Sequence, residues 1–232
     1  MTLRPIFYDL ETTGIDNKKD RIIEIAAYDP TLNKTYCKLV NPNMPIPHES
    51  TQITNITDDM VKDAKAFDEI SKEFVEFCSG DVVLIAHNND NFDKLFLKNE
   101  FARVNVTFPD FLYVDSLKWA RKYRSDLPRH ALQYLREIYK IEQNNAHRAL
   151  DDVMVLYKVF MNMVDDLNIE TIHKLLYQTT NELLTHMPFG KYSGKPLKEV
   201  PSNYIQWLNK NEVLEKDEHQ TLKKSLKQLN LI

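Results

Sequence analysis

The stretch Ile6-Phe7-Tyr8-Asp9-Leu10-Glu11-Thr12-Thr13-Gly14 sets two carboxylates in a mostly apolar run. Alternate side chains of a β-strand lie on one face, so Asp9 and Glu11 would point the same way. Two adjacent anions repel each other, and each is costly to remove from water. A divalent cation between them would resolve both problems, because hard cations such as Mg²⁺ prefer oxygen ligands. A solvent-facing edge strand is the alternative, but the flanking apolar residues favour a central strand.

Composition narrows the class of protein. The 232 residues are enough for one domain and a small appendage, and the net charge of −4 excludes a generally basic protein that coats nucleic acid. A local basic groove is still allowed. Cys37 and Cys78 cannot build a disulfide framework, so we expect a reducing, cytoplasmic location. We expect no membrane association, because the sequence has neither an N-terminal signal segment nor an apolar run of about 20 residues.

Hydrophobic patterning predicts an α/β fold with a mixed sheet flanked by helices. Residues 3–40 predict an antiparallel meander of three strands, because short turns separate apolar runs. Residues 82–86 are fully apolar, as in a strand buried on both faces, and residues 111–114 predict a short fifth strand. Helices are expected at 51–64, 67–78, from 93 onward, at 116–123, 130–139 and 147–168.

Two further acids occur where the pattern predicts burial. Asp93 ends a polar cluster, residues 87–93, that directly follows the apolar strand, the place where open α/β sheets usually bind ligands. It could also act simply on the dipole of the helix that it begins. On the last predicted helix, Asp152 falls at the margin of the buried side, whereas Asp151 falls on the surface side. A metal shared with Asp9 and Glu11 would explain a buried Asp152.

Taken together, these acids and one histidine form a set that suits a two-metal phosphodiester hydrolase. In such sites the metals lie roughly 3.5–4 Å apart and bridge the scissile phosphate. One metal lowers the pKa of a water, and the other stabilises the leaving 3′-oxygen. A histidine, with an ordinary pKa of about 6.5, can accept the proton of that water. The candidate residues are Asp9, Glu11, Asp93, His147 and Asp152.

Three motifs in order carry a resemblance to a known family. They are Asp9-Leu10-Glu11-Thr12-Thr13-Gly14, then His87-Asn88 with Phe92-Asp93, and finally His147-x-Ala149-x-x-Asp152. The chain resembles the DEDDh 3′→5′ exonucleases of the RNase H-like superfamily. The histidine five residues before Asp152 matches the histidine type, since Arg148 stands where the tyrosine type has its tyrosine. This resemblance implies an RNase H-like five-stranded sheet, an antiparallel meander plus parallel strands.

The resemblance also implies roles for the matched residues. It implies a site for two Mg²⁺ ions, with Mn²⁺ as the alternative ion. The acids that it assigns to the metals are Asp9, Glu11, Asp93 and Asp152. It assigns the role of general base to His147. Contacts to the terminal nucleotide are implied for the Leu10 side chain and for the backbone N–H groups of Thr12 and Thr13.

The C-terminal segment resembles a second pattern. Phe189-Gly190-Lys191-Tyr192-Ser193-Gly194-Lys195 and Tyr204-x-x-Trp207-Leu208 are similar to the C-terminal region of the bacterial exodeoxyribonuclease X family. That similarity implies a DNA exonuclease that releases 5′-mononucleotides from single-stranded or duplex 3′ ends, with a role in DNA repair. We predict an exonuclease domain at 1–168, a helical connector at 169–185 and a small C-terminal domain at 186–232.

Several alternatives stay open. The enzyme could be an exoribonuclease that trims RNA, because the motifs do not determine how the 2′-OH is recognised. A polymerase proofreading or accessory module is a further alternative; a non-catalytic nucleic-acid-binding module would be expected to lack an acid or the histidine, yet all five are present. The basic and aromatic residues of 116–129 suit either nucleic acid or a solvated helix face. The C-terminal lysines could hold DNA, or their domain could only pack on the first. No sequence feature defines an oligomeric state.

Overall fold

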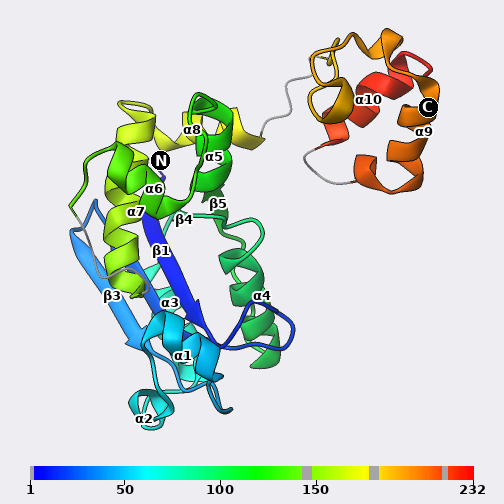
Figure 1. Ribbon diagram of the computed structural model, residues 1–232. Coiled ribbons are helices and arrows are strands. Elements are labelled where there is room, and N and C mark those ends of the chain that lie inside the picture. The colour runs from blue at the N-terminus through cyan, green and yellow to red at the C-terminus, as the bar shows by residue number, and fades with distance from the viewer. Residues whose placement is uncertain (1–2, 143–147, 178–182, 216–218) are drawn as a thin grey trace. The chain divides into compact units, whose positions relative to one another are not determined.

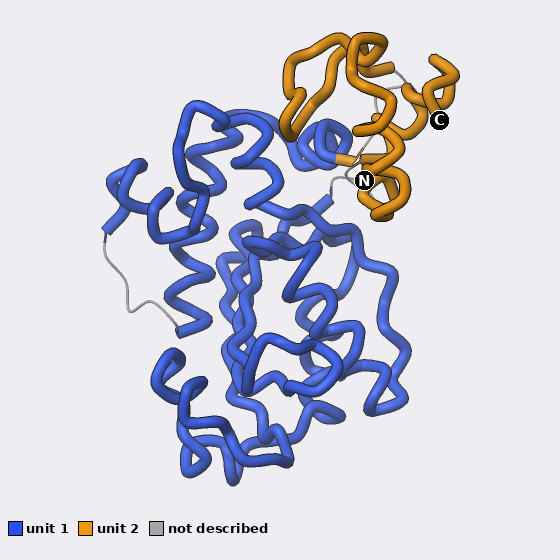
Figure 2. Tube along the Cα trace, turned by 45° about the vertical axis from the view of Figure 1, so that its right-hand side comes forward, with its two compact units in different colours: residues 1–176 blue, residues 177–232 orange. Residues whose placement is uncertain are grey.

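The computed structural model describes residues 3–142, 148–177, 183–215 and 219–232. The chain divides into two compact units, Met1–Leu176 and Tyr177–Ile232 (Figures 1 and 2). Each unit has a hydrophobic core of its own.

A mixed five-stranded sheet forms the centre of the first unit, in the order β3-β2-β1-β4-β5. β1 pairs antiparallel with β2, which pairs antiparallel with β3, whereas β4 runs parallel to both β1 and β5. The predicted meander and parallel strands are thus confirmed, with β1 in the middle. The strands are β1 (Arg4–Thr12), β2 (Ile22–Asp29), β3 (Lys34–Leu39), β4 (Val82–Ala86) and β5 (Leu112–Asp115).

The central strand sends alternate side chains into two layers. Tyr8 belongs to the core cluster that also contains residues of α3 (Phe67–Phe77) and α4 (Asp93–Arg103). The ring of Phe7 instead packs edge-to-face on Phe160 of α7 (Ala149–Val164), with ring centroids 5.7 Å apart. Asp9 and Glu11 are in phase with Phe7, so both face the α7 side of the sheet. Figure 1 shows α7 lying along this side of the strands.

Helix α7 is buried on two sides. Phe160 packs on the sheet, while Val155 and Val159 form a separate cluster with Leu135 of α6 (Leu132–Ile138). The sequence predicted one apolar stripe and an end near residue 168. The helix ends earlier, at Val164, because the next residue takes a left-handed φ of 52°.

The other helices of the first unit follow the predicted ranges with one break. The helix expected at 51–64 is two short helices, since Asn55 takes a left-handed φ of 58° between them. Asp115 caps the helix after it by accepting hydrogen bonds from two backbone N–H groups, as predicted. In the described ranges, no helix combines the length and apolar character needed to cross a bilayer. The remaining helices of the first unit are α1 (His48–Thr54), α2 (Asp58–Val61), α5 (Ser116–Tyr123) and α8 (Ile169–Tyr177).

The second unit is a small helical fold around a leucine-rich core. Its buried residues include Leu197, Ile205, Leu208 and Leu222, which come from all parts of the unit. Burying these side chains stabilises a fold that contains few regular elements. The described elements are η1 (Gly190–Tyr192), η2 (Leu197–Glu199), α9 (Ser202–Lys210), η3 (Val213–Glu215) and α10 (Gln220–Gln228).

Candidate functional site

Three of the predicted acids meet between β1 and α7. Asp9, Glu11 and Asp152 each offer a carboxylate oxygen, and these oxygens lie within 4.8 Å of one another. Glu11 and Asp152 are buried, while Asp9 is partly exposed. The strand period puts the first two on the α7 side of the sheet, and Asp152 lies in the first turn of α7. The structure therefore places on one side of the sheet the three acids that the sequence located separately.

Asp93 lies at the start of α4 and outside that group of three. Its side chain is buried, and its Oδ1 has no hydrogen-bond partner in the part of the chain that the structure describes. It lies close enough to Asp9 for its charge to be the second cause, after burial, that raises the pKa of Asp9. A buried carboxylate oxygen without a donor is what a bound cation would satisfy.

The carboxyls repel one another in a low-dielectric site. The pKa of Glu11 is raised to about 8, mainly by burial and also by the charges of Asp152 and Glu24, while Arg148 opposes the rise. Burial likewise raises the pKa of Asp93 to about 8. The all-oxygen donor set, its burial and the unpartnered Oδ1 fit a hard divalent cation, which would displace the protons that Glu11 and Asp93 keep at neutral pH.

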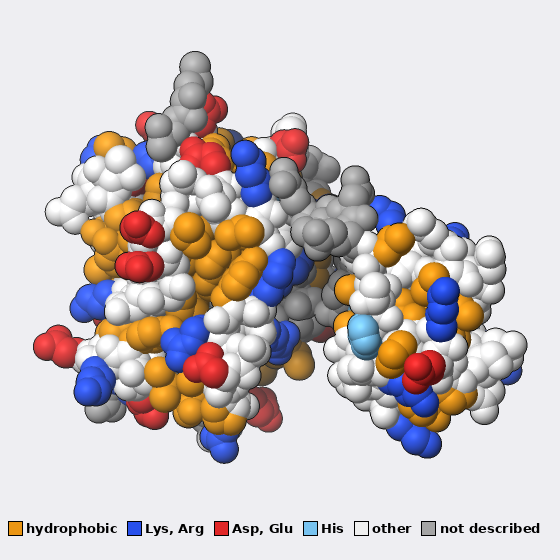
Figure 3. Space-filling view, turned by 90° about the horizontal axis from the view of Figure 1, so that it is seen from above, with side chains coloured by type: hydrophobic (Ala, Val, Ile, Leu, Met, Phe, Trp, Pro, Cys, Tyr) orange, Lys and Arg blue, Asp and Glu red, His pale blue; other side chains and the backbone are white. Residues whose placement is uncertain are grey.

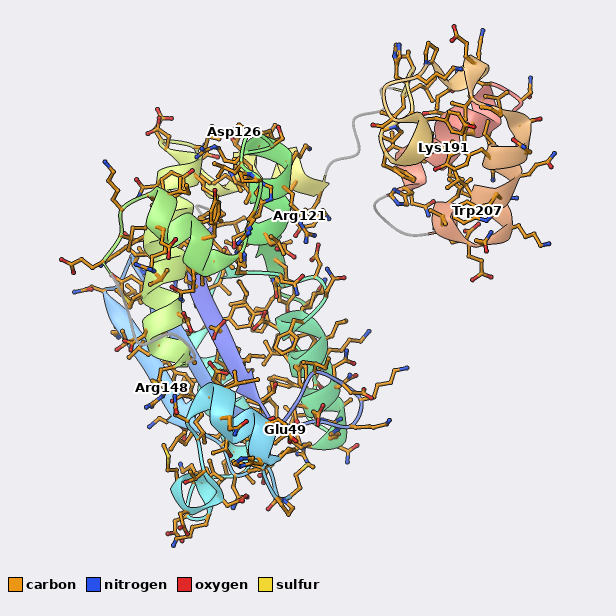
Figure 4. The ribbon with its side chains drawn as sticks, in the orientation of Figure 1. Glu49, Arg121, Asp126, Arg148, Lys191 and Trp207 are labelled. Carbon is orange, nitrogen blue, oxygen red and sulfur yellow. The ribbon has the colours of Figure 1, made fainter. Side chains whose placement is uncertain are left out.

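Glu24 holds the beginning of α7 next to this site. Glu24 is buried and lies opposite Glu11 in the register of the antiparallel strands β1 and β2. Its carboxylate accepts a hydrogen bond from the N–H of Ala149 at 3.0 Å and one from Arg148 at 3.1 Å. Figure 4 labels Arg148 near this end of the helix. These two contacts of Glu24 fix the turn that carries Asp152.

Gln133 is a contact of the site that sequence reasoning missed. Its Nε2 donates to Oδ1 of Asp152 at 2.9 Å, and its own Oε1 accepts from Arg136 at 2.8 Å. Arg136 also donates to the carbonyl of Ile141 at 3.0 Å. The contact joins two helices, so no local sequence pattern marks it; the only signal was an acid at a buried helical position.

The polar loop before Asp93 is fixed by buried hydrogen bonds. Asp115 accepts the backbone N–H groups of Asn88 and Asp90 at 3.1 and 3.0 Å. The hydroxyl of Tyr8 donates to Oδ1 of buried Asn89 at 2.5 Å. These contacts set the backbone that leads into α4, and so the position of its first residue.

His87 is a structural histidine rather than a second base. Its Nδ1 lies 2.8 Å from the hydroxyl of Ser116, and its Nε2 lies 2.9 Å from the carbonyl of His130. Burial lowers the pKa of His87 to about 4. The ring is therefore neutral near pH 7 and links β4, α5 and the segment before α6.

The predicted nucleotide contacts lie around the end of β1. Leu10 is buried in the core on the α3 and α4 side. The N–H of Thr13 already donates to the carbonyl of Arg21 at 2.9 Å, and the hydroxyl of Thr12 donates to Gly14 at 2.6 Å. A side chain at Gly14 would collide with the neighbouring Asp20 carboxylate. The roles of Leu10, Thr12 and Thr13 stay predictions, and His147 lies outside the described residues.

The basic segment around α5 has structural partners. Trp119 is buried, so it is not a stacking platform. Lys122 donates to the carbonyl of Leu175 at 2.6 Å, and Arg124 pairs with Asp126 at 2.9 Å. Trp119, Lys122 and Arg124 therefore have structural partners, which neither interpretation of 116–129, a nucleic-acid-binding segment or a solvated helix face, included.

Comparison of the sequence with known proteins finds two matching families. A family model described as "Exonuclease" matches residues 6–160, and one described as "Putative quorum-sensing-regulated virulence factor" matches residues 168–217. The PolC-type DNA polymerase III of Caldanaerobacter subterraneus is 35% identical over 165 residues, 70% of this chain and 12% of that protein. Exonuclease DPD1 of Arabidopsis thaliana is 36% identical over 184 residues, 72% and 58% respectively. The chain thus spans less than two thirds of both relatives.

Solved structures share the fold of the first unit. E. coli Exonuclease I in complex with a dA16 oligonucleotide gives a TM-score of 0.64 at 20% identity, covering 76% of this chain and 43% of that one. Cell-death related nuclease 4 gives a TM-score of 0.58 at 18% identity, covering 71% and 64%. The mixed sheet with its flanking helices is therefore an architecture that known nucleases also have.

Proposed function

The chain belongs to the exonuclease family that matches residues 6–160 and is a nuclease, and from this premise we propose that it is a metal-dependent 3′→5′ exodeoxyribonuclease. The observation that carries the proposal is the meeting of Asp9, Glu11 and Asp152, whose carboxylate oxygens lie within 4.8 Å of one another. Hydrolysis would release 5′-mononucleotides.

In this proposal Asp9, Glu11 and Asp152 hold divalent metal, with Asp93 as the fourth acid of a two-ion site. Mg²⁺ or Mn²⁺ bound there would polarise the scissile phosphate and make a bound water more acidic. Burial of the acids limits competition from bulk water, and repulsion among them raises their affinity for a cation. We assign acceptance of the water's proton to His147, because an imidazole of ordinary pKa, about 6.5, can act near neutral pH.

Two neighbours of the site have positioning roles. Gln133 orients the Asp152 carboxylate through its bond to Oδ1. Glu24 anchors the first turn of α7 through the N–H of Ala149. Fixed ligands favour catalysis because a ligand displaced by about 1 Å can cost on the order of 100-fold in rate.

DNA is the substrate that the relatives favour. The names of the relatives include DNA polymerases, and Exonuclease I was solved with a DNA oligonucleotide. A role in DNA repair is proposed only from the resemblance that the sequence of residues 189–208 has to exodeoxyribonuclease X. Trimming of RNA 3′ ends is the alternative substrate class, and the division at 1–168, 169–185 and 186–232 is proposed with the function.

Proofreading is a second candidate function. The PolC-type DNA polymerase III of Clostridium perfringens is 31% identical over 215 residues, 89% of this chain and 14% of that protein. A proofreading module would act on a mismatched primer terminus and associate with a polymerase. Faster removal of a mismatched than of a matched 3′ nucleotide would favour this function over general degradation.

The decisive experiment follows 5′-labelled DNA and RNA oligonucleotides of identical sequence in Mg²⁺, Mn²⁺ and chelator. We expect a metal-dependent ladder that shortens from the 3′ end on DNA and is weak on RNA. A circular single strand serves as the substrate without ends, and Asp152→Ala as the inactive control. Stronger cleavage of RNA would overturn the DNA assignment. Cleavage of the circle, or full activity in Asp152→Ala, would overturn the exonuclease proposal or its site.

A further inference from the structure

A line of aromatic rings runs from the core to the surface of the second unit, with Tyr192 and Tyr204 partly buried and Trp207 exposed. The ring of Tyr192 meets that of Tyr204 edge-to-face at 4.9 Å, and Tyr204 lies nearly parallel to Trp207 at 6.0 Å. Trp207 ends this line with 53% of its side chain exposed. The buried neighbours of Trp207 on α9, Ile205 and Leu208, fill the core instead. The tryptophan thus has a place in the aromatic line but is not needed to close the core.

Positive charge accompanies these rings. The ammonium of Lys191 lies 5.6 Å from the centre of the Tyr192 ring. Residues 186–210 contain four lysines and one acid, Glu199, in a chain whose net charge is −4. The face of this unit visible in Figure 3 shows several basic side chains and one acidic group among exposed hydrophobic ones, and Figure 4 labels Lys191 and Trp207 on the unit.

A glycine turn sets the first lysine and tyrosine against α9. Gly190 has a φ of +75°, and a Cβ there would collide with the hydroxyl of Tyr204. Gly194 closes the turn with a φ of +78°, and its N–H donates to the carbonyl of buried Met187 at 2.8 Å. Only glycine tolerates both the left-handed backbone and the close approach. The placement of Lys191 and Tyr192 beside Tyr204 is therefore built into the backbone.

From these features we infer that the aromatic-lysine face, formed by Lys191, Tyr192, Tyr204 and Trp207, binds single-stranded DNA. Bases stack on exposed aromatic rings without regard to sequence, and lysines attract the phosphates between them. The choice of DNA as the ligand rests on the proposed function, whereas the aromatic contacts and the positive charge are independent of that function. Binding by a second unit of the same chain would keep the strand near the active site between cuts, by raising its effective concentration.

Tryptophan fluorescence of the full chain provides a direct test. The two tryptophans differ in exposure, 2% for Trp119 and 53% for Trp207, so Trp119→Phe leaves a single reporter on the face. Oligo(dT) of about 16 nucleotides is long enough to cover the site size of one small binding fold. It is added in the presence of a chelator, which prevents cleavage. We expect saturable quenching that weakens as salt is raised.

Affinity of matched variants then separates a binding face from a structural one. Trp207→Ala should weaken oligo(dT) binding about ten-fold and Trp207→Phe only slightly, because a ring is retained. Lys191→Ala should weaken it several-fold, whereas Lys158→Ala, the same change on exposed α7 surface, should not. Unchanged affinity in Trp207→Ala, or tighter binding of oligo(U) than oligo(dT), would overturn the inference. A lower Tm with unchanged affinity would mean that Trp207 packs against protein instead.

The same variants distinguish this inference from the proposed function. Trp207→Ala should hydrolyse a DNA trinucleotide like the wild type, because three nucleotides are fewer than the roughly 4–16 that one small binding fold covers, but should degrade a long strand more slowly. Equal rates on the long strand would overturn the tethering role. Binding without hydrolysis by any form of the protein would refute the exonuclease proposal and leave the face intact.

Discussion

Replacing Glu11 by Gln removes a buried carboxyl from the site and should stabilise the metal-free protein at alkaline pH. Burial raises the pKa of Glu11 to about 8 in the folded chain, whereas in the unfolded chain it returns towards 4.5. Between these values the folded state binds more protons than the unfolded state. The free energy of unfolding therefore falls as the pH rises through this window, and Gln at position 11 escapes the loss.

The size of the effect follows from the two pKa values. Their separation, from 4.5 to about 8, corresponds at about 1.4 kcal/mol per pKa unit to an upper limit of roughly 4–5 kcal/mol. Water entry and relaxation around a buried charge reduce this limit, so we expect a gain of about 2–3 kcal/mol near pH 8. For a unit of this size the gain raises Tm by roughly 4–12 °C. Near pH 5 the gain should nearly vanish.

Thermal unfolding in chelator at these two pH values measures the difference. Asp151→Asn is the control, since it also removes one carboxylate charge but from a partly exposed position of α7, and it should change stability by less than about 0.5 kcal/mol. Added Mg²⁺ should raise the Tm of the wild type more than that of Glu11→Gln. If Glu11→Gln gives no gain in Tm near pH 8, or an equal gain at both pH values, the fold does not disfavour the ionised form of Glu11 and the reasoning is refuted.

Three further predictions concern the surroundings of Asp152. Asp152→Ala should abolish nearly all hydrolysis in the labelled-oligonucleotide assay while Asp151→Ala stays close to wild type; similar losses in both would contradict the assignment. Gln133→Leu should lower kcat and metal affinity about 10–100-fold with little change in Tm, as for other residues that orient metal ligands, and unaltered Mg²⁺ titration would argue against that role. Glu24→Leu should lower the free energy of unfolding in urea by about 2–4 kcal/mol, because the N–H of Ala149 loses its acceptor; an unchanged midpoint would show that the contact is dispensable.

Local periodicity was enough to predict the strands and the shared face of Asp9 and Glu11. Alternation along β1 put Asp9 and Glu11 on one face, and helical spacing put Asp152 at a buried margin, because both patterns depend only on nearby residues. The structure confirms the strands and gathers these three acids. It does not describe His147, so its role still depends on the resemblance.

Contacts between distant segments were beyond such reasoning. The bond from Gln133 to Asp152 joins two helices whose packing no single segment determines. The break at Asn55 and the early end of α7 before Asp165 depend on single left-handed residues. Asn and Asp tolerate that conformation but do not require it, so a helical pattern alone could not locate these ends. The burial of Trp119 was likewise not predicted, because the basic residues around it in the sequence suggested an exposed helix.

The alternation of β1 also determines which insertions this protein could survive. The strand is at once part of the hydrophobic core through Tyr8 and part of the acidic site through Asp9 and Glu11. Inserting one residue before Tyr8 would exchange the two faces, turning carboxylates into the α3–α4 core and an aromatic ring towards α7. The turn that follows, from Gly14 to Asp20, could change in length without altering that phase. The loops around this strand can therefore change in length during evolution. The alternation of side chains along β1 cannot, because both the stability of the fold and the chemistry of the site depend on it.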